Sequence, residues 1–191
     1  MMIKITRQTK ETDIKVELEL YGSGKSNIET GIGFFDHMLE AFCKHSLMDL
    51  NITCKGDTHI DFHHSVEDVG IVLGQALKKA IFPIENVERY ANAVVVMDEA
   101  AVESCLDLSN RAFLVYAVDM SGKVGEFDVE LAEEFFRAVV HAAGLTLHVE
   151  CKRGRNKHHI LEAAFKSFAV ALRRSIEKNQ RVGIPSTKGV L

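Results

Sequence analysis

The chain contains the stretch His63-His64-Ser65-Val66-Glu67, and 95 residues later it contains His158-His159-Ile160-Leu161-Glu162. Two adjacent histidines and a glutamate hold the same places in both copies. The repetition extends outward, because residues 50–55 match residues 147–152 at an offset of 97 residues. A two-residue difference in one loop accounts for the change of offset. The sequence therefore predicts an internal duplication, with the join near residues 84 to 92.

Strands are marked by apolar residues that alternate with polar ones. This pattern occurs in both halves, at residues 14–20, 50–54 and 145–151. Between the halves, residues 93–97 form an apolar run, Ala-Val-Val-Val-Met, which suits a buried strand.

Helices are marked by apolar residues three and four positions apart. One stripe covers residues 66–81, with Pro83 just past its end, and its counterpart covers residues 161–176. Strands and helices in a repeating order predict an α+β fold of two similar halves, each a mostly antiparallel sheet with helices packed on one face. We place the first half at residues 1–88 and the second at residues 89–191, in one compact unit with a shared core.

Composition narrows the class of protein. A hydrophobic fraction of 47% with 26% charged residues is typical of a globular domain. A net charge of −4 gives no reason to expect binding to nucleic acid, and no apolar run approaches the length of a membrane span. We therefore expect a cytoplasmic protein, with no nucleic acid and no membrane among its partners.

The two motifs carry the donor groups of a metal site. Residues three and four apart share one face of a helix, so Glu67 can reach the same side as His63 and His64. Adjacent histidines, however, diverge by about 100°. One ion cannot easily accept both rings, whereas two ions could take one each. Imidazole and carboxylate together suit manganese, iron, zinc or nickel.

A purely structural interpretation competes with the metal site. A single His-His-x-x-Glu is most often a solvated helix start with a His–Glu pair, and the second copy at the matching place favours the metal. The repeat also suggests further ligands, because His37 has Glu134 as its counterpart 97 residues later. Glu134 could equally be a solvated helix residue.

Three stretches together resemble one known family. They are Gly31-Ile32-Gly33-Phe34-Phe35-Asp36-His37-Met38-Leu39, His63-His64-Ser65-Val66-Glu67-Asp68-Val69-Gly70 and the ending Ile184-Pro185-Ser186-Thr187-Lys188-Gly189-Val190. The chain resembles the imidazoleglycerol-phosphate dehydratases of histidine biosynthesis over nearly its whole length. Two manganese ions per active site are implied, with other divalent metals as alternatives.

The resemblance also implies the reaction. Members remove water from imidazole glycerol phosphate and produce imidazole acetol phosphate. Metals on the two ring nitrogens would favour the imidazolate, which can expel the side-chain hydroxyl through a diazafulvene-like intermediate. A carboxylate then removes the neighbouring proton, giving an enol that becomes the ketone.

Site residues are carried over by position. The implied metal ligands are His37, His63, His64, Glu67, His158, His159 and Glu162, with Glu134 where the family often has histidine. Glu11 matches a substrate-contacting glutamate and is the first candidate for acid–base catalysis, with Glu67 and Glu162 as the other catalytic carboxylates. The substrate phosphate is expected to meet Arg89, Arg111, Lys166, Ser186 and Lys188.

The resemblance further implies a homo-oligomer, a shell of 24 subunits in which more than one subunit builds each active site. Two other classes of function stay open from the residues. One is a different binuclear metal enzyme, a hydrolase or oxidase. The other is a non-catalytic protein whose metals only join subunits. An RNA-binding module is disfavoured by the negative charge and by the lack of an aromatic, basic stripe.

Overall fold

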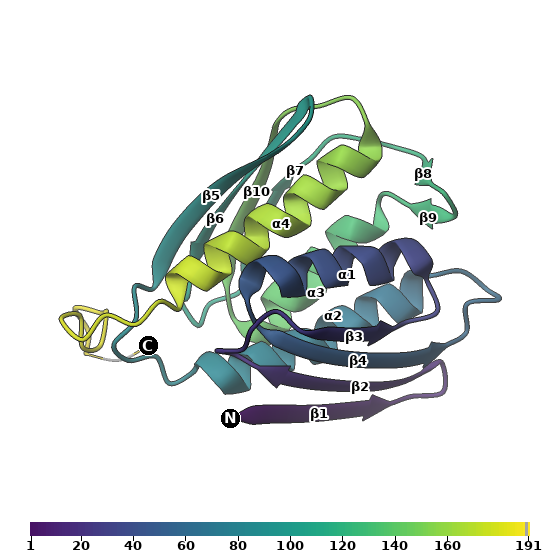
Figure 1. The fold of residues 1–191 in the computed structure, drawn as a ribbon. Helices are drawn as coiled ribbons and strands as arrows, with labels where there is room; N and C mark the ends of the chain where they lie inside the picture. Colours follow the sequence, from purple (N-terminus) through teal and green to yellow (C-terminus); the bar gives the residue numbers. More distant parts are fainter. Residues whose placement is uncertain (190) are drawn as a thin grey trace.

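A computed structural model describes residues 1–189 and 191, and it shows the same series of elements twice (Figure 1). The first half consists of β1 (Met2–Gln8), β2 (Thr12–Glu19), β3 (Ser26–Glu29), α1 (Gly33–Ser46), β4 (Asp49–Gly56) and α2 (His63–Ile81). The second consists of β5 (Tyr90–Met97), β6 (Ala100–Asp107), β7 (Phe113–Ala117), α3 (Leu131–Ala143), β10 (Thr146–Arg153) and α4 (Lys157–Ser175), with a small hairpin, β8 (Lys123–Val124) and β9 (Phe127–Asp128), before α3. The predicted α+β duplication is confirmed.

The two sheets have the same topology. Their strand orders are β1-β2-β4-β3 and β5-β6-β10-β7. Neighbours are antiparallel except at one edge, where β3 runs parallel to β4 and β7 runs parallel to β10. The first hairpins also correspond, since β2 begins at Thr12 and β6 begins at Ala100, 88 residues later. The offsets of 95 and 97 are visible as matching residues in the sequence, whereas this offset of 88 is visible only in the structure.

The helices lie between the two sheets, and each pairs with a helix of the other half (Figure 1). Helix α2 packs against α3, and α1 packs against α4, while α2 also covers β1 and β2 and α4 covers β5 and β6. Among the described residues, the outer face of each sheet is open to solvent, as the alternating burial of β2 and β5 shows. The shared core is therefore made of contacts between halves.

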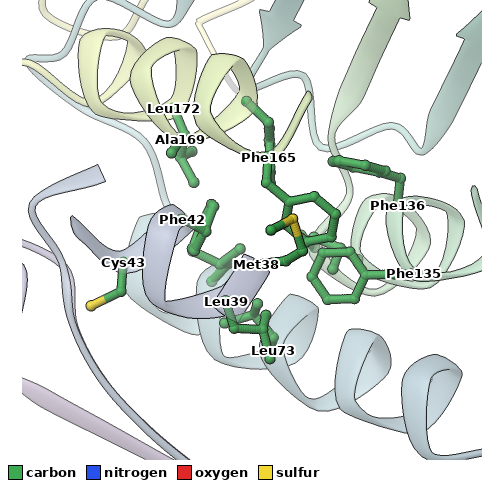
Figure 2. Packing of buried hydrophobic residues seen from close by; sticks show 14 of the residues in the cluster. Met38, Leu39, Phe42, Cys43, Leu73, Phe135, Phe136, Phe165, Ala169 and Leu172 are labelled. Carbon is green, nitrogen blue, oxygen red and sulfur yellow. The ribbon is translucent and has the colours of Figure 1, made fainter. Parts of the chain in front are cut away.

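Aromatic and aliphatic side chains from all four helices fill this core (Figure 2). The ring centroids of Phe42 and Phe168 lie 5.3 Å apart, and those of Phe35 and Phe135 also lie 5.3 Å apart. These four rings have no exposed surface. Each such side chain contributes roughly 1.5–3 kcal/mol by its burial, so the junction between halves is a major source of stability.

Helices α2 and α3 approach closely at two glycines. A Cβ atom at Gly70 would lie 3.0 Å from the carbonyl oxygen of Phe135. At Gly74 it would lie 2.7 Å from the carbonyl oxygen of Val139. Because backbone atoms cannot move aside as a flexible side chain can, the absence of a side chain at these positions sets the distance between the two helices.

The apolar run at residues 93–97 is not a buried strand. It lies in β5, at the edge of its sheet, where Ala93 is buried but Val94 and Val96 are 54% and 71% exposed. An edge strand with one uncovered face alternates in burial whatever its composition. Separately, none of the helices in the described ranges is both long and apolar enough to cross a membrane.

Replacement of Gly74 by alanine is expected to destabilise the protein. Alanine favours helix by about 1 kcal/mol over glycine, but overpacking against a backbone carbonyl costs about 1–3 kcal/mol. The net loss should be up to about 2 kcal/mol in the free energy of unfolding, measured by urea denaturation. Gln75→Ala, at an exposed position of the same helix, is the matched control. A Gly74→Ala protein more stable than wild type would contradict the packing argument.

Candidate metal centre and active site

Both His-His motifs lie in the first turn of a helix, as the sequence predicts. At the start of α4, the Asn156 side chain accepts hydrogen bonds from the backbone N–H groups of His158 and His159. At the start of α2, the Asp61 carboxylate accepts the N–H of His63 at 2.8 Å. The paired rings diverge, with interplanar angles of 86° for His63 and His64 and 80° for His158 and His159. The two histidines of each pair therefore have different neighbours.

The first histidine of the second motif, His158, belongs to a group with residues from both halves. We call this group the His158 cluster, and it consists of His37, His158 and Glu162. Glu162 Oε2 lies 3.0 Å from His158 Nε2 and 3.4 Å from His37 Nε2. One donor atom from each residue lies within 4.8 Å of the others. Two imidazoles and a carboxylate converging in this way suit a divalent ion, so the residues present fit the metal that the sequence implies.

Lys166 belongs to the same place. Its ammonium lies 2.5 Å from Glu162 Oε1, one helical turn along α4. Burial of Glu162, whose side chain is only 8% exposed, acts to raise its pKa, but Lys166 and His158 together outweigh this effect. The pKa of Glu162 is therefore lower than usual, and the carboxylate is ionised and able to accept a cation.

A counterpart forms around α2, and we call it the His63 cluster: His63, Glu67 and Glu134. His63 Nε2 lies 3.8 Å from Glu67 Oε2. Glu67 and Glu134 line one groove of about 500 Å³ between α2 and α3. Arg137 Nε lies 3.8 Å from Glu134 Oε2 in the same groove. Glu134, the counterpart of His37 in the repeat, thus lines the same groove as Glu67, while among the described residues only the His158 cluster brings its donor atoms within 4.8 Å of one another.

The second histidine of each motif faces carboxylates on loops of its own half. His64 Nδ1 lies 3.0 Å from Asp57 Oδ2 and 3.9 Å from Glu11 Oε2. His159 Nδ1 lies 2.8 Å from Glu99 Oε2. The hydrogen bond to Asp57 raises the pKa of His64, and the bond to Glu99 raises the pKa of His159. The contact with His159, aided by backbone N–H groups, lowers the pKa of Glu99 to about 2.

Asp57 and Glu99 are not predicted as site residues from the sequence. Neither lies in a repeated motif at the offsets of 95 or 97. Glu99, however, directly precedes β6 as Glu11 directly precedes β2, so a comparison at an offset of 88 residues would have paired them.

The hairpin that carries Glu11 is fixed to α2 by Asp68. The buried Asp68 carboxylate accepts a hydrogen bond from Thr12 Oγ1 at 2.5 Å, and Arg7 Nη2 lies 3.0 Å from its other oxygen. Both partners belong to the hairpin of β1 and β2. Asp68 therefore holds the Glu11 turn against the helix that bears His64.

Most of the residues expected to bind phosphate lie elsewhere in the chain. Arg89 is 8% exposed, its Nε lies 2.7 Å from Asp107 Oδ1, and its Nη1 donates to the carbonyl oxygen of Pro185. Ser186 and Lys188 follow in the same tail, where the Lys188 N–H donates to Ser186 Oγ.

Strand β6 separates these residues from the histidines. It runs from the Glu99 turn beside His159 to Asp107 beside Arg89, and eight residues at about 3.3 Å each span roughly 25 Å. Exposed Arg111 follows the same end of β6, so only Lys166 of the phosphate candidates lies with the histidines.

Comparison with known proteins identifies the family. The family model for imidazoleglycerol-phosphate dehydratase matches residues 30–172. The chain belongs to the imidazoleglycerol-phosphate dehydratase family. It is therefore assigned to the hydro-lyases, enzymes that remove water by breaking a carbon–oxygen bond.

Relatives of this family match along the whole chain. The imidazoleglycerol-phosphate dehydratase of Aliarcobacter butzleri is 71% identical over 190 residues, covering 100% of both chains. That of Campylobacter curvus is 68% identical and covers 100% of this chain and 98% of its own. The crystal structure of the Staphylococcus aureus dehydratase superposes with a TM-score of 0.85 at 39% identity, covering 94% of this chain and 100% of that one. The fold is thus the one solved for this family.

Replacement of Asp68 by alanine is expected to lower the free energy of unfolding by about 2–4 kcal/mol, because it leaves the Thr12 hydroxyl and the Arg7 guanidinium without their buried partner. Urea denaturation measures the loss. Asp13→Asn, at an exposed position of the same hairpin, should change stability by no more than about 0.5 kcal/mol. Equal stabilities for the two variants would show that Asp68 does not anchor the hairpin.

Proposed function

We propose that this protein converts imidazole glycerol phosphate to imidazole acetol phosphate and water, in histidine biosynthesis, and that it uses two manganese ions. One observation carries the metal part of this proposal. The two halves join at two imidazole–carboxylate groups in matching places of the repeat. The donor atoms of the His158 cluster lie within 4.8 Å of one another, the two carboxylates of the His63 cluster line one groove, and each cluster contains residues of both halves. A solvated helix start would not bring in His37 or Glu134 from a helix of the other half.

The ligands would be the members of the two clusters together with His64 and His159. Divalent ions bound by them would act as Lewis acids and stabilise negative charge on the azole ring of the substrate. Glu162 suits this task because its pKa is low enough to keep it ionised. The diverging rings of each His-His pair would let neighbouring ions share one helix start.

Glu11 is the proposed acid–base residue. Its carboxylate is 54% exposed on a turn beside His64, so it can reach a bound substrate. It would take the proton from the carbon next to the one that loses the hydroxyl group. The hydroxyl would leave as water, and the enol left behind would become the ketone. Arg89, Arg111, Lys166, Ser186 and Lys188 would bind the phosphate and hold the substrate in register.

We propose further that complete active sites need more than one subunit. Arg89 and the tail lie at the opposite end of β6 from His159, too far for both to reach one small substrate. A second copy could bring its own tail to the histidines. A homo-oligomer follows, and the resemblance to the family suggests 24 subunits.

Replacement of His158 by alanine should weaken manganese binding by at least about a hundredfold, judged against the tenfold to hundredfold loss typical when only a supporting residue is removed. Turnover of imidazole glycerol phosphate should fall with the bound metal. Titration of metal-free protein with Mn²⁺, followed by the electron paramagnetic resonance of the free ion, measures the first effect. His148→Ala is the control, since His148 lies on the outer face of the second sheet, opposite Cys105. Full manganese occupancy in His158→Ala would refute the metal assignment.

Mixed oligomers should recover activity that neither parent has. His158→Ala lacks a cluster ligand, and Lys188→Ala lacks a phosphate contact. Subunits mixed after chelation and reassembled with manganese should include sites with one intact copy of each part. If the mixture stays as inactive as its parents while wild type recovers in the same procedure, sites shared between subunits are excluded. A generic phosphoester serves as the substrate control for a hydrolase.

A further inference from the structure

We propose that Asp57 and Glu99 are positioning residues for His64 and His159: each carboxylate fixes the tautomer and direction of its imidazole, and Asp57 thereby leaves Glu11 free for proton transfer. This inference rests on the metal-binding part of the proposed function. It adds two residues that neither the repeated motif nor the family resemblance supplied.

The donor capacity of the two groups decides where the imidazole proton lies. An ionised carboxylate only accepts hydrogen bonds, and a neutral imidazole has one N–H and one lone pair. Asp57 lies 3.0 Å from His64 Nδ1, and Glu99 lies 2.8 Å from His159 Nδ1. The proton must therefore be on Nδ1 in both rings. Nε2 then carries the lone pair and faces away from the carboxylate, where it can bind a metal ion.

Hydrogen bonding within its own loop does not explain why a buried aspartate occupies position 57. A loop aspartate commonly accepts backbone N–H groups, as Asp61 does from His63. Asp57 Oδ1 instead is buried and has no hydrogen-bond partner within the described ranges. Its side chain is only 14% exposed. Burying a carboxylate is costly, and the one strong contact it makes here is to His64.

Glu99 is held in place independently of its histidine. Its Oε1 accepts the backbone N–H groups of Arg155 at 3.1 Å and Asn156 at 2.7 Å, while Oε2 faces His159. Three contacts fix both oxygens of the carboxylate. The same turn of backbone leads into α4, so Glu99 ties the direction of the His159 ring to the start of the helix that bears it.

The duplication shows why the first half needs Asp57. Glu11 and Glu99 occupy equivalent places, each directly before the second strand of its hairpin. Glu99 contacts His159 directly, but Glu11 is 3.9 Å from His64, and Asp57 makes the close contact instead. Asp57 comes from the segment between β4 and His63, which is two residues longer than the segment between β10 and His158. The longer loop supplies a second carboxylate, and Glu11 remains uncommitted.

Manganese titration of metal-free protein tests Glu99. Glu99→Ala should bind manganese about 10–100-fold more weakly. Glu99→Gln has a single amide oxygen, which can accept either the Nδ1 proton or the backbone N–H groups but not both, and it should lose less than Glu99→Ala. Asp13→Asn removes a carboxylate from an exposed strand position and should bind as wild type does. Unchanged affinity in both Glu99 variants would overturn the inference, whereas a wild-type protein that binds no manganese would overturn the proposed function instead.

The tautomers of His64 and His159 can be measured directly, and they would not change if Asp57 and Glu99 only stabilised the fold. Nitrogen-15 spectra of histidine-labelled, metal-free protein, recorded well above the imidazole pKa, should show His64 and His159 with the proton on Nδ1. In Glu99→Gln, His159 should become a mixture of tautomers, because the amide can donate to Nδ1 as well as accept from it. His64 should not change in that variant. An Nε2–H tautomer in wild type at either residue would exclude the proposal.

A third comparison tests the freedom of Glu11. Glu11→Ala alone should leave manganese affinity within about twofold, while turnover falls. Asp57→Ala should weaken manganese binding less than Glu99→Ala does, because Glu11 can move to His64, and its turnover should fall as Glu11 is diverted. The double variant Asp57→Ala/Glu11→Ala should then lose more affinity than the two single losses combined. Additive losses, or an affinity loss in Glu11→Ala as large as in Asp57→Ala, would overturn the division of roles.

Discussion

The packing of helices across the two halves is the constraint on which the rest of the molecule depends. Helix α2 rests on α3 and α1 rests on α4, so no half buries its helices by itself. The absence of side chains at Gly70 and Gly74 fixes one of these contacts at the level of the backbone. Because His37 and Glu134 lie on the helices that cross over, the same packing that forms the core also brings His37 to Glu162 and Glu134 to the groove lined by Glu67.

The histidines at both helix starts are matched by nearby carboxylates. Each imidazole at a helix start has a carboxylate within reach, and the buried Glu162 has Lys166 beside it as well. The carboxylates hold the rings in position, while the low pKa of Glu162 and of Glu99 keeps negative charge where a cation would bind. These interactions join residues of one helical turn with residues on distant loops, and so they couple the site to the β-hairpins at the edge of each half.

The sequence predicts the duplication, the two helix starts and the divergence of the paired histidines, because these follow from local periodicity and from a motif that occurs twice. The partners at the site are harder to predict. Asp57 and Glu99 meet their histidines through the path of loops, and Glu99 lies 60 residues from His159. The exposure of Val94 and Val96 depends on the place of β5 at a sheet edge. The separation of Arg89 from the histidines depends on the direction of β6, which no pattern of residues reveals.

The cross-over of helices also bears on the history of the two copies. Had each copy kept a cluster to itself, one of them could have drifted while the other kept working. Here a change in either copy disturbs both clusters, because His37 serves a helix of the second copy and Glu134 serves a helix of the first. The copies lost their independence when they became one chain. This accounts for two motifs that still match while most of the surrounding residues have diverged.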